Sequence, residues 1–367
     1  MKKLFVTLLT VIMTLSLCAL AACVKDSETN TPPSTPAYFT VEGSTITGVT
    51  LDGRKQETLV VPEAVDGVTI TAIGNDAFSG SEKVKNVQLP DTITTIGDKA
   101  FYECKNLTQI NLPSGINSIG VSAFTSCSKL QSIDIPTGIS EIPNETFREC
   151  RSLNNVTIPS NITKIGEKAF EKCIAFTKIH LPASVSTLSN DAFTNCNSVT
   201  EFSVDSNSQY FRTIDGNLYS KDGKTFVYYA LGKTDKTFTV PEGVVTLGWA
   251  AFANEMELET VNVATTVQSL GYECFSACQG LKYITFGGWD SSLTTINHRA
   301  FFNCVQLYSI EAPESLNYIG RFAFSYCSRV GKVYSYKAAA DWDSIDVSRV
   351  ASDGNLVYLN ESIREYM

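Results

Sequence analysis

A phrase close to Ile-Gly-x-x-Ala-Phe-x-x-Cys recurs along this chain at a nearly constant interval. Six copies lie 23 residues apart, and four more follow after a gap. Their phenylalanines are Phe78, Phe101, Phe124, Phe147, Phe170, Phe193, Phe252, Phe275, Phe301 and Phe324. A fixed period of roughly 20–29 residues is typical of a solenoid, in which each short unit stacks on the next. The period therefore predicts one elongated array of coils rather than separate globular domains.

The unit that contains Phe124 shows how the pattern specifies a coil. Residues 109–112 alternate polar and apolar side chains, as a short strand with one buried face does. Pro113 has no N–H to donate to a ladder and ends the strand. Gly120 then permits a close approach of the main chain before a short helical turn that carries Phe124, and Cys127 closes the unit. One unit buries too little to fold alone, so each is expected to depend on its neighbours.

These features predict an α/β solenoid with one parallel β-sheet and short helical turns on the opposite side. About twelve rungs are expected, with strands that end at Val61, Leu89, Leu112, Ile135, Ile158, Leu181, Val204, Val240, Val263, Phe286 and Ala312 and a last strand near Val333. At a strand spacing of about 4.8 Å the predicted sheet is about 55 Å long.

The combination of Ile-x-Leu-Pro, Ile-Gly, Ala-Phe and x-x-Cys-x-x-Leu over residues 57–335 resembles the BspA-type leucine-rich repeats of bacterial surface proteins. The resemblance implies a leucine-rich repeat, right-handed coil on a secreted or surface-attached protein. It also implies adhesion or host interaction, which several members are described as performing. That second implication is looser, because one fold serves many partners.

The N-terminus has the features of an export signal. Met1-Lys2-Lys3 is basic, Leu4 to Leu20 is apolar without a charge, and Ala21-Ala22-Cys23 supplies small residues before a cysteine. This resembles a bacterial lipobox, which implies a signal peptide at 1–22 and a lipid anchor at Cys23 that holds the protein on the cell envelope, exported and surface-exposed. An ordinary secretory signal and an uncleaved anchor helix are the alternatives. The polar, proline-rich segment 23–36 is expected to be a flexible tether.

The period breaks in three places. The unit at about 205–240 is 36 residues long from Val204 to Val240, lacks Ala-Phe, and alternates around Asp222-Gly223, which predicts a β-hairpin. A smaller hairpin is expected at Asp66-Gly67, and a third insertion contains Trp289. Insertions of this kind carry function in some solenoids, and elsewhere they are tolerated loop drift.

Caps are expected at both ends of the solenoid, because its terminal coils would otherwise expose their core. Residues 37–56 contain two strand-like runs and form the predicted N-terminal cap. The predicted C-terminal cap is 336–367, where four apolar residues fall outside the repeat: Trp342, Ile345, Val357 and Tyr358.

The cysteines form a column of their own: Cys104, Cys127, Cys150, Cys173, Cys196, Cys278, Cys304 and Cys327. An exported chain suggests disulfides, but Ser81 and Glu255 occupy the same slot, and stacked equivalents point their Cβ atoms in parallel rather than toward one another. We therefore favour a buried ladder of reduced thiols. Rungs about 4.8 Å apart cannot wrap ligands around one zinc ion, so no metal site is predicted.

Other chemistry is weakly represented. The chain has only two histidines, His180 and His298, and neither has an evident catalytic partner in the sequence. No nucleotide-binding or metalloprotease motif is present, so neither an enzyme nor a cofactor is predicted. The net charge of −9 without a basic cluster argues against nucleic acid as a partner.

The outward strand positions differ between the two halves of the repeat array. They are rich in amides and hydroxyls before the long insertion and richer in aromatic residues after it. The candidate binding residues are Tyr283, Trp289, Tyr308 and Tyr334, together with Tyr219 and Tyr228 of the predicted hairpin. The alternative is a polar sheet face that only keeps the solenoid soluble.

Together these observations predict a non-catalytic cell-surface recognition protein that presents its repeat face to an extracellular protein or glycan, as in adhesion. The rival prediction is a structural role, in which the protein acts as an envelope scaffold or self-associates without an external ligand.

Overall fold

The structure is a computed structural model that describes residues 38–330 and 332–335. The signal peptide and tether predicted at 1–22 and 23–36, with Cys23, lie outside the described residues. So does the segment 336–367, with Trp342, Ile345, Val357 and Tyr358.

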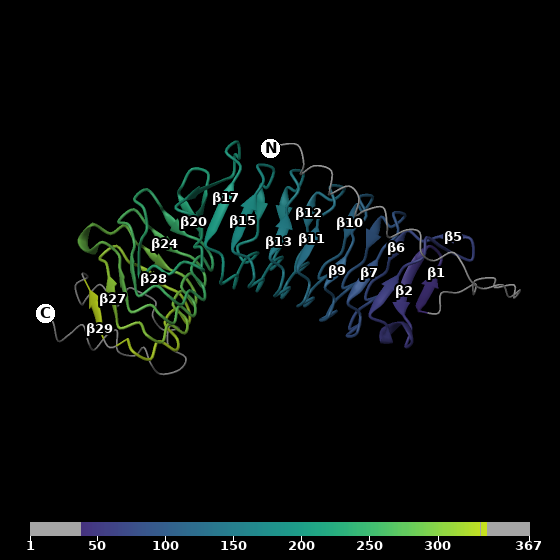
Figure 1. Cartoon of the computed structure of the whole chain (residues 1–367). Coiled ribbons are helices and arrows are strands. Elements are labelled where there is room, and N and C mark those ends of the chain that lie inside the picture. Colours follow the sequence, from purple (N-terminus) through teal and green to yellow (C-terminus); the bar gives the residue numbers. More distant parts are fainter. Residues whose placement is uncertain (1–37, 331, 336–367) are drawn as a thin grey trace, which may run out of the picture. The chain divides into compact units, whose positions relative to one another are not determined.

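The described chain forms a β-solenoid whose coils each contribute two short strands, and the coils follow one another in chain order (Figure 1). We call the two series ladder A and ladder B. Ladder A contains β3 (Thr58–Val60), β7 (Asn86–Gln88), β9 (Gln109–Ile110), β11 (Ser132–Asp134), β13 (Asn155–Thr157), β15 (Lys178–Leu181), β17 (Glu201–Val204), β21 (Thr237–Thr239), β23 (Thr260–Asn262), β25 (Tyr283–Thr285), β27 (Ser309–Ala312) and β29 (Lys332–Ser335). Ladder B contains β2 (Thr45–Val49), β6 (Ala72–Ile73), β8 (Thr95–Ile96), β10 (Ser118–Ile119), β12 (Glu141–Ile142), β14 (Lys164–Ile165), β16 (Thr187–Leu188), β20 (Thr225–Tyr228), β22 (Thr246–Leu247), β24 (Ser269–Leu270), β26 (Thr295–Ile296) and β28 (Tyr318–Ile319).

The prediction of a single parallel sheet is therefore wrong, although about twelve coils are present as expected. Ladder B strands are mostly two residues long, for example Thr95–Ile96 paired with Ser118–Ile119. So short a strand cannot show an alternating pattern in the sequence. Gly120 follows one of these strands, and a Cβ there would lie 2.3 Å from the main-chain nitrogen of Asp98 in the preceding coil. Only glycine allows the two coils to approach so closely at this position.

The predicted helical turns are also absent. The Ala-Phe segments form what we call the turn arm, a run of tight turns whose main chain alternates between two kinds of hydrogen bond. The N–H groups of Tyr102 and Cys104 donate three residues back within the coil, to the carbonyls of Lys99 and Phe101. The N–H groups of Lys99, Phe101 and Glu103 donate to the next coil instead, at 2.8–2.9 Å.

Left-handed main-chain conformations explain why this arm is not a helix. Lys99 and Glu103 have φ angles of 53° and 55°, and most coils repeat these two positions. A left-handed residue every fourth position turns alternate N–H groups outward, toward the neighbouring coil, and so prevents helical bonding. None of the left-handed residues is Val, Ile or Thr, for which this conformation costs most.

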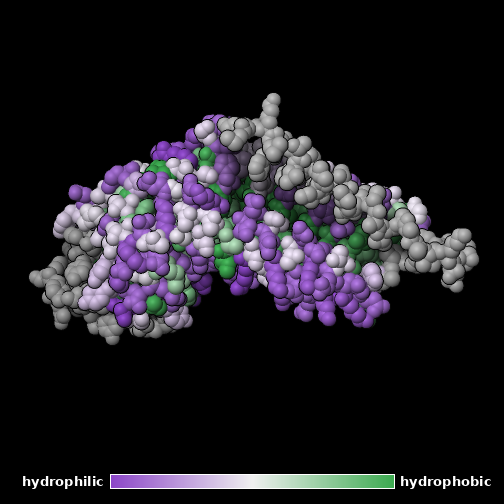
Figure 2. All heavy atoms as spheres, in the orientation of Figure 1, coloured by the Kyte–Doolittle hydropathy of each residue, from purple (hydrophilic) through white to green (hydrophobic). Residues whose placement is uncertain are grey.

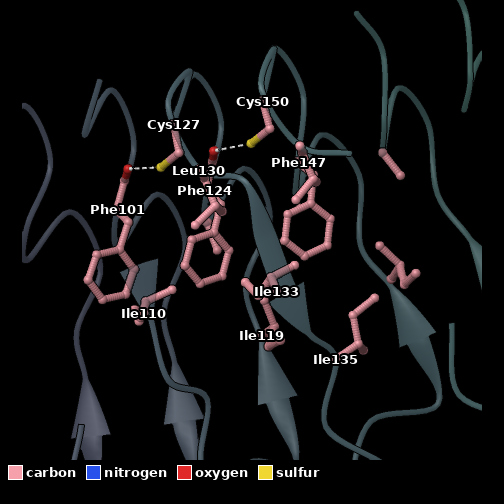
Figure 3. Packing of buried hydrophobic residues seen from close by; sticks show 14 of the residues in the cluster. Phe101, Ile110, Ile119, Phe124, Cys127, Leu130, Ile133, Ile135, Phe147 and Cys150 are labelled. Atoms are coloured by element: carbon pink, nitrogen blue, oxygen red, sulfur yellow. Dashed lines mark hydrogen bonds between the residues drawn. The ribbon is translucent and has the colours of Figure 1, made fainter. Parts of the chain in front are cut away.

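The phenylalanines of the repeat fill the middle of each coil and are all buried. Within each half their rings follow one another at centroid separations of 4.7–5.6 Å (Figure 3). The described cysteines are buried free thiols. Each thiol of the column donates to a phenylalanine carbonyl of an earlier coil, as Cys127 does to Phe101 at 3.2 Å (Figure 3). The cysteines thus satisfy main-chain acceptors as well as filling space.

The long insertion contains the predicted hairpin and one further strand. β19 (Asn217–Ser220) and β20 pair antiparallel around Asp222-Gly223, as expected. β18 (Phe211–Ile214) pairs with β19 across Asp215-Gly216, where both residues have positive φ. β20 also pairs in parallel with β22, so the hairpin starts the second half of ladder B.

The shorter irregular elements lie where the period breaks. β4 (Ala64–Val65) and β5 (Val68–Thr69) form the small hairpin predicted at Asp66-Gly67. β1 (Phe39–Glu42) pairs antiparallel with β2 at the start of ladder B. Two 3-10 turns complete the list, η1 (Gly53–Lys55) and η2 (Gly288–Asp290). Among the described residues there is no helix long and apolar enough to cross a membrane.

Candidate binding surface

Two of the predicted binding residues, Tyr283 and Tyr308, lie exposed on or beside strands of ladder A. Successive strand residues point to opposite faces, so the residues on either side of each buried Ile or Val face away from the core. Tyr283 of β25 and Tyr308 beside β27 are 49% and 50% exposed, and their ring centroids lie 6.4 Å apart at an interplanar angle of 64°. Two neighbouring coils therefore present one aromatic pair at the surface.

Trp289 extends the aromatic surface beyond these strands. It lies in η2, directly after β25, and is 69% exposed. Gly287 and Gly288 both have positive φ, and this conformation allows the chain to leave the strand and form η2. Tyr334 lies in β29, opposite Glu311 of β27, and its side chain is outside the described part of the structure. We call Tyr283, Trp289 and Tyr308 the aromatic surface.

The hairpin tyrosines do not belong to this surface, and the prediction that they are contact residues is corrected. Tyr219 and Tyr228 are 1% and 4% exposed. The hairpin does not project from the solenoid but forms a wall between two core clusters: Leu218 and Tyr228 pack with the coils before it, and Tyr219 and Phe226 with those after it. Both faces of the hairpin are therefore buried, each against one of the two core clusters. The sequence analysis had assigned one of these faces to solvent.

Tyr228 takes the place of a missing coil. Its hydroxyl donates to the carbonyl of Ser189 at 2.9 Å and accepts from the N–H of Phe193 at 3.5 Å. In the regular coils that N–H position donates to the main chain of the next unit. Burial raises the pKa of the Tyr228 hydroxyl well above its ordinary value, which keeps it neutral and able to donate.

A second set of exposed aromatic residues was missed by the sequence analysis. Trp249 and Tyr272 follow the Leu-Gly of their coils and pack edge to face at 5.4 Å. His298 occupies the same position in a later coil, and its Nε2 lies 2.9 Å from the hydroxyl of Tyr318. The signal was the residue after the glycine, which is Asn75 or Asp98 in earlier coils and Trp249 or Tyr272 in two later ones.

Three side chains on ladder A resemble a hydrolase relay. The Nδ1 of His180 lies 3.0 Å from the hydroxyl of Ser203, and its Nε2 lies 3.2 Å from a carboxylate oxygen of Asp205. A hydrolase also needs donors that stabilise the oxyanion, and β17 uses its main chain to pair with β15. The contacts of His180 with Ser203 and Asp205 join two adjacent coils at an exposed face.

The cysteines and the ion pairs of the described chain also contribute to the packing of the coils. Burial raises the pKa of Cys104 to about 12 and that of the other described column thiols for which a shift is resolved, so they stay protonated rather than acting as nucleophiles. No group of three or more potential metal ligands occurs among the residues that the structure describes. Ion pairs such as Lys282–Glu259 at 2.7 Å join neighbouring coils at their exposed edges.

Comparison with known proteins agrees with this reading of the fold. A family model described as the BspA type leucine rich repeat region matches in six copies, over residues 64–150, 122–221 and 224–339. A leucine rich cell surface protein from Faecalibacterium prausnitzii A2-165 is 27% identical with a TM-score of 0.63, and the match covers 87% of this chain and 99% of that one.

Two further solved structures share the fold at lower identity. The pneumococcal vaccine antigen PcpA is 24% identical with a TM-score of 0.69, covering 81% of this chain and 78% of that one. A leucine-rich repeat protein from Bacteroides ovatus ATCC 8483 is 22% identical with a TM-score of 0.50, covering 82% and 88%. No curated protein matches the chain significantly. The match of the repeat model over most of the chain shows that this protein belongs to the BspA-type leucine-rich repeat family.

Proposed function

We propose that this protein is a non-catalytic recognition protein of the bacterial cell surface, which binds an extracellular partner through the aromatic surface of its later coils. The observation that carries the proposal is the exposed ring pair of Tyr283 and Tyr308 on ladder A, with Trp289 also exposed in η2, the turn that follows β25. Its similarity to a leucine rich cell surface protein supports the location. Attachment through a lipidated Cys23 is part of the same proposal.

The chemistry of the aromatic surface favours a protein partner. Tyrosine and tryptophan provide a large contact area with few rotatable bonds, so they concentrate at the energetic centres of protein interfaces. Three such exposed rings bring a solenoid no benefit of their own, because their exposed apolar area lowers its solubility. Thr260 pairs with Tyr283 across the neighbouring strand, and Asn262 pairs with Thr285 two residues further on, so polar side chains that suit the rim of an interface share these two strands with the tyrosine.

Adhesion of cells that display the full chain tests the proposal. Cells are incubated on surfaces coated with purified extracellular-matrix proteins or with mucin, and bound cells are counted. The variant Tyr283→Ala/Trp289→Ala/Tyr308→Ala is expected to lose about tenfold or more of the apparent affinity for the partner. Val60→Ala, at an exposed position of ladder A in an early coil, serves as the control and is expected to adhere like the parent.

Two results would refute the proposal. One is adhesion of the triple variant that equals that of the parent, with surface display of both confirmed by antibody. The other is concentration-dependent self-association of the purified chain without adhesion to any coated surface, which would support the structural role instead.

A further inference from the structure

A second candidate site lies in the early coils, away from the aromatic surface. Ladder A is hollowed there over β3, β7, β9 and β11, and the cavity measures about 730 Å³. Small-molecule sites commonly occupy about 300–1,000 Å³. We call this cavity the polar groove. The described surface in Figure 2 is mostly hydrophilic, with smaller hydrophobic patches.

The polar groove offers side chains that have no partner within the described protein. Gln88, Gln109, Ser132 and Asp134 line it and are exposed, and their side chains make no hydrogen bond to another described residue. Asn111 is different, because its side chain is already hydrogen-bonded. Its amide oxygen accepts from the N–H of Leu89 and its amide nitrogen donates to the carbonyl of Leu89, each at 2.9 Å. The four unpartnered groups therefore form a set of donors and acceptors that the fold does not use.

A seam in ladder A lies beneath these side chains. β7 pairs with β9 and β11 pairs with β13, but β9 and β11 belong to different sheets. Pairing with a neighbouring strand is what normally satisfies main-chain N–H and C=O groups. The seam therefore marks a change in the pairing of ladder A beneath the groove.

The residues that line the groove favour some classes of ligand over others. Asp134 is the only charged residue that lines it, and no lining residue is aromatic. Lysine and arginine are the usual side chains for anionic ligands, and aromatic and arginine side chains are the usual anchors of protein interfaces, and none of them lines the groove. A neutral sugar presents several hydroxyl groups that each donate and accept, and these match amides, a hydroxyl and one carboxylate.

We propose that the polar groove binds a neutral oligosaccharide through Gln88, Gln109, Ser132 and Asp134. This site is independent of the aromatic surface, so the protein holds a glycan with its early coils and a protein partner with its later ones. Binding at one site does not require the other.

The test uses the purified full chain in a detergent without a sugar headgroup, because such a headgroup would compete for the site. Saturation-transfer difference NMR is recorded at millimolar concentrations of maltotriose, cellotriose and triacetylchitotriose. An anionic oligogalacturonate and a neutral Gly/Ser peptide are measured under the same conditions. At least one neutral trisaccharide is expected to bind, and neither the anion nor the peptide.

Variants then locate the binding. Gln88→Ala/Gln109→Ala/Ser132→Ala is expected to weaken binding at least tenfold, and Gln109→Arg, which puts a long side chain over the groove, is expected to abolish it. The matched control is Asn155→Ala/Thr157→Ala, on the adjacent β13 but outside the groove, and it is expected to bind like the parent.

The outcomes separate this proposal from the proposed function. Failure of every neutral trisaccharide to bind overturns it, as does tighter binding of the anion or the peptide, or unchanged binding by both groove variants. Loss of binding by the aromatic triple variant Tyr283→Ala/Trp289→Ala/Tyr308→Ala would also overturn it, because the sugar would then lie in the later coils. None of these results bears on adhesion through the aromatic surface.

Discussion

The coils before the long insertion, residues 58–204, and those after it, residues 237–335, share one core plan and differ at the surface. In the early part of the described chain Tyr38 is the only largely exposed aromatic residue. From the insertion onward the largely exposed aromatic residues are Tyr210, Trp249, Tyr272, Tyr283, Trp289, Tyr308, Tyr318 and Tyr326. One repeat thus supports two unlike surfaces, because packing constrains only the inward positions.

The ladders differ between the two parts as well. Ladder A is one continuous sheet from β21 to β29, whereas in the early coils it is divided between β9 and β11 and again between β13 and β15. The polar groove lies over the first of these seams. The proposed contact surface therefore lies on a continuous sheet, and the proposed sugar site lies over a break in the sheet.

The largest expected effect comes from removing one phenylalanine ring in either core. Phe124→Ala and Phe301→Ala are each expected to cost about 3–5 kcal/mol of folding free energy, since each ring is fully buried between two others. Hydrogen exchange read by mass spectrometry is expected to rise mainly in coils 58–204 for the first and in coils 237–335 for the second, because the cores form separate clusters. Equal loss of protection across both parts in both variants would show that the hairpin does not separate them.

The hairpin that joins the two parts supplies a matched pair of substitutions. Tyr228→Phe removes one of the two donors to the carbonyl of Ser189 and leaves the N–H of Phe193 without its acceptor, and it is expected to cost about 1–3 kcal/mol. Tyr229→Phe removes a buried hydroxyl that has no hydrogen-bond partner, and is expected to be neutral or stabilising. Denaturant unfolding of both variants measures the difference, and an equal loss of stability would contradict the assigned role of Tyr228.

Glu255 distinguishes the later core from the early one. It takes the cysteine slot and is 1% exposed, and its carboxylate accepts the N–H groups of Glu257 and Leu258 at 2.8 and 2.7 Å. Burial, with Glu257 nearby, raises its pKa above the ordinary 4.5, and the two N–H groups oppose that rise only in part. The folded state therefore holds this proton more tightly than the unfolded state does.

The raised pKa of Glu255 sets how the stability of the later coils depends on pH. As pH rises from 4.5 through the raised pKa, the later coils are expected to lose stability, and Glu255→Gln is expected to remove that slope. Hydrogen exchange of coils 237–335 as a function of pH measures it, with the Cys150 coil as the internal reference. A slope that persists unchanged in Glu255→Gln would assign the effect to another group.

The smallest expected effect concerns the left-handed positions of the turn arm. Glu103 has a φ of 55° and Asn303, at the equivalent position of a later coil, has a φ of 61°. Asparagine tolerates this conformation better, so Glu103→Asn is expected to raise stability by a few tenths to about 1 kcal/mol, and Asn303→Glu to lower it by a similar amount. Thermal melting compares the two variants, and changes of the same sign would rule out backbone strain as their cause.

The repeat could be read from sequence because its signal is redundant. Phe124 and its equivalents recur ten times, and the Asp222-Gly223 turn was recognisable because its type demands these residues. The turn arm was misread because Ala123-Phe124 has the composition of a helical turn, whereas the left-handed residues beside it are Ser122 and Ser126, which carry no such signal. The binding surface was only half predicted, since exposure of Tyr283 follows from its strand but burial of Tyr219 depends on a second core.

The sequence by itself determined the repeat, its inward column of phenylalanines and cysteines, and the places where the period breaks, because each depends on contacts between equivalent residues a fixed distance apart. Only the tertiary structure decided that each coil has two strands, that the hairpin is a wall between cores, and that the pairing of ladder A is interrupted between β9 and β11. These features arise from contacts between residues in different coils, and no local pattern of one or two residues encodes them.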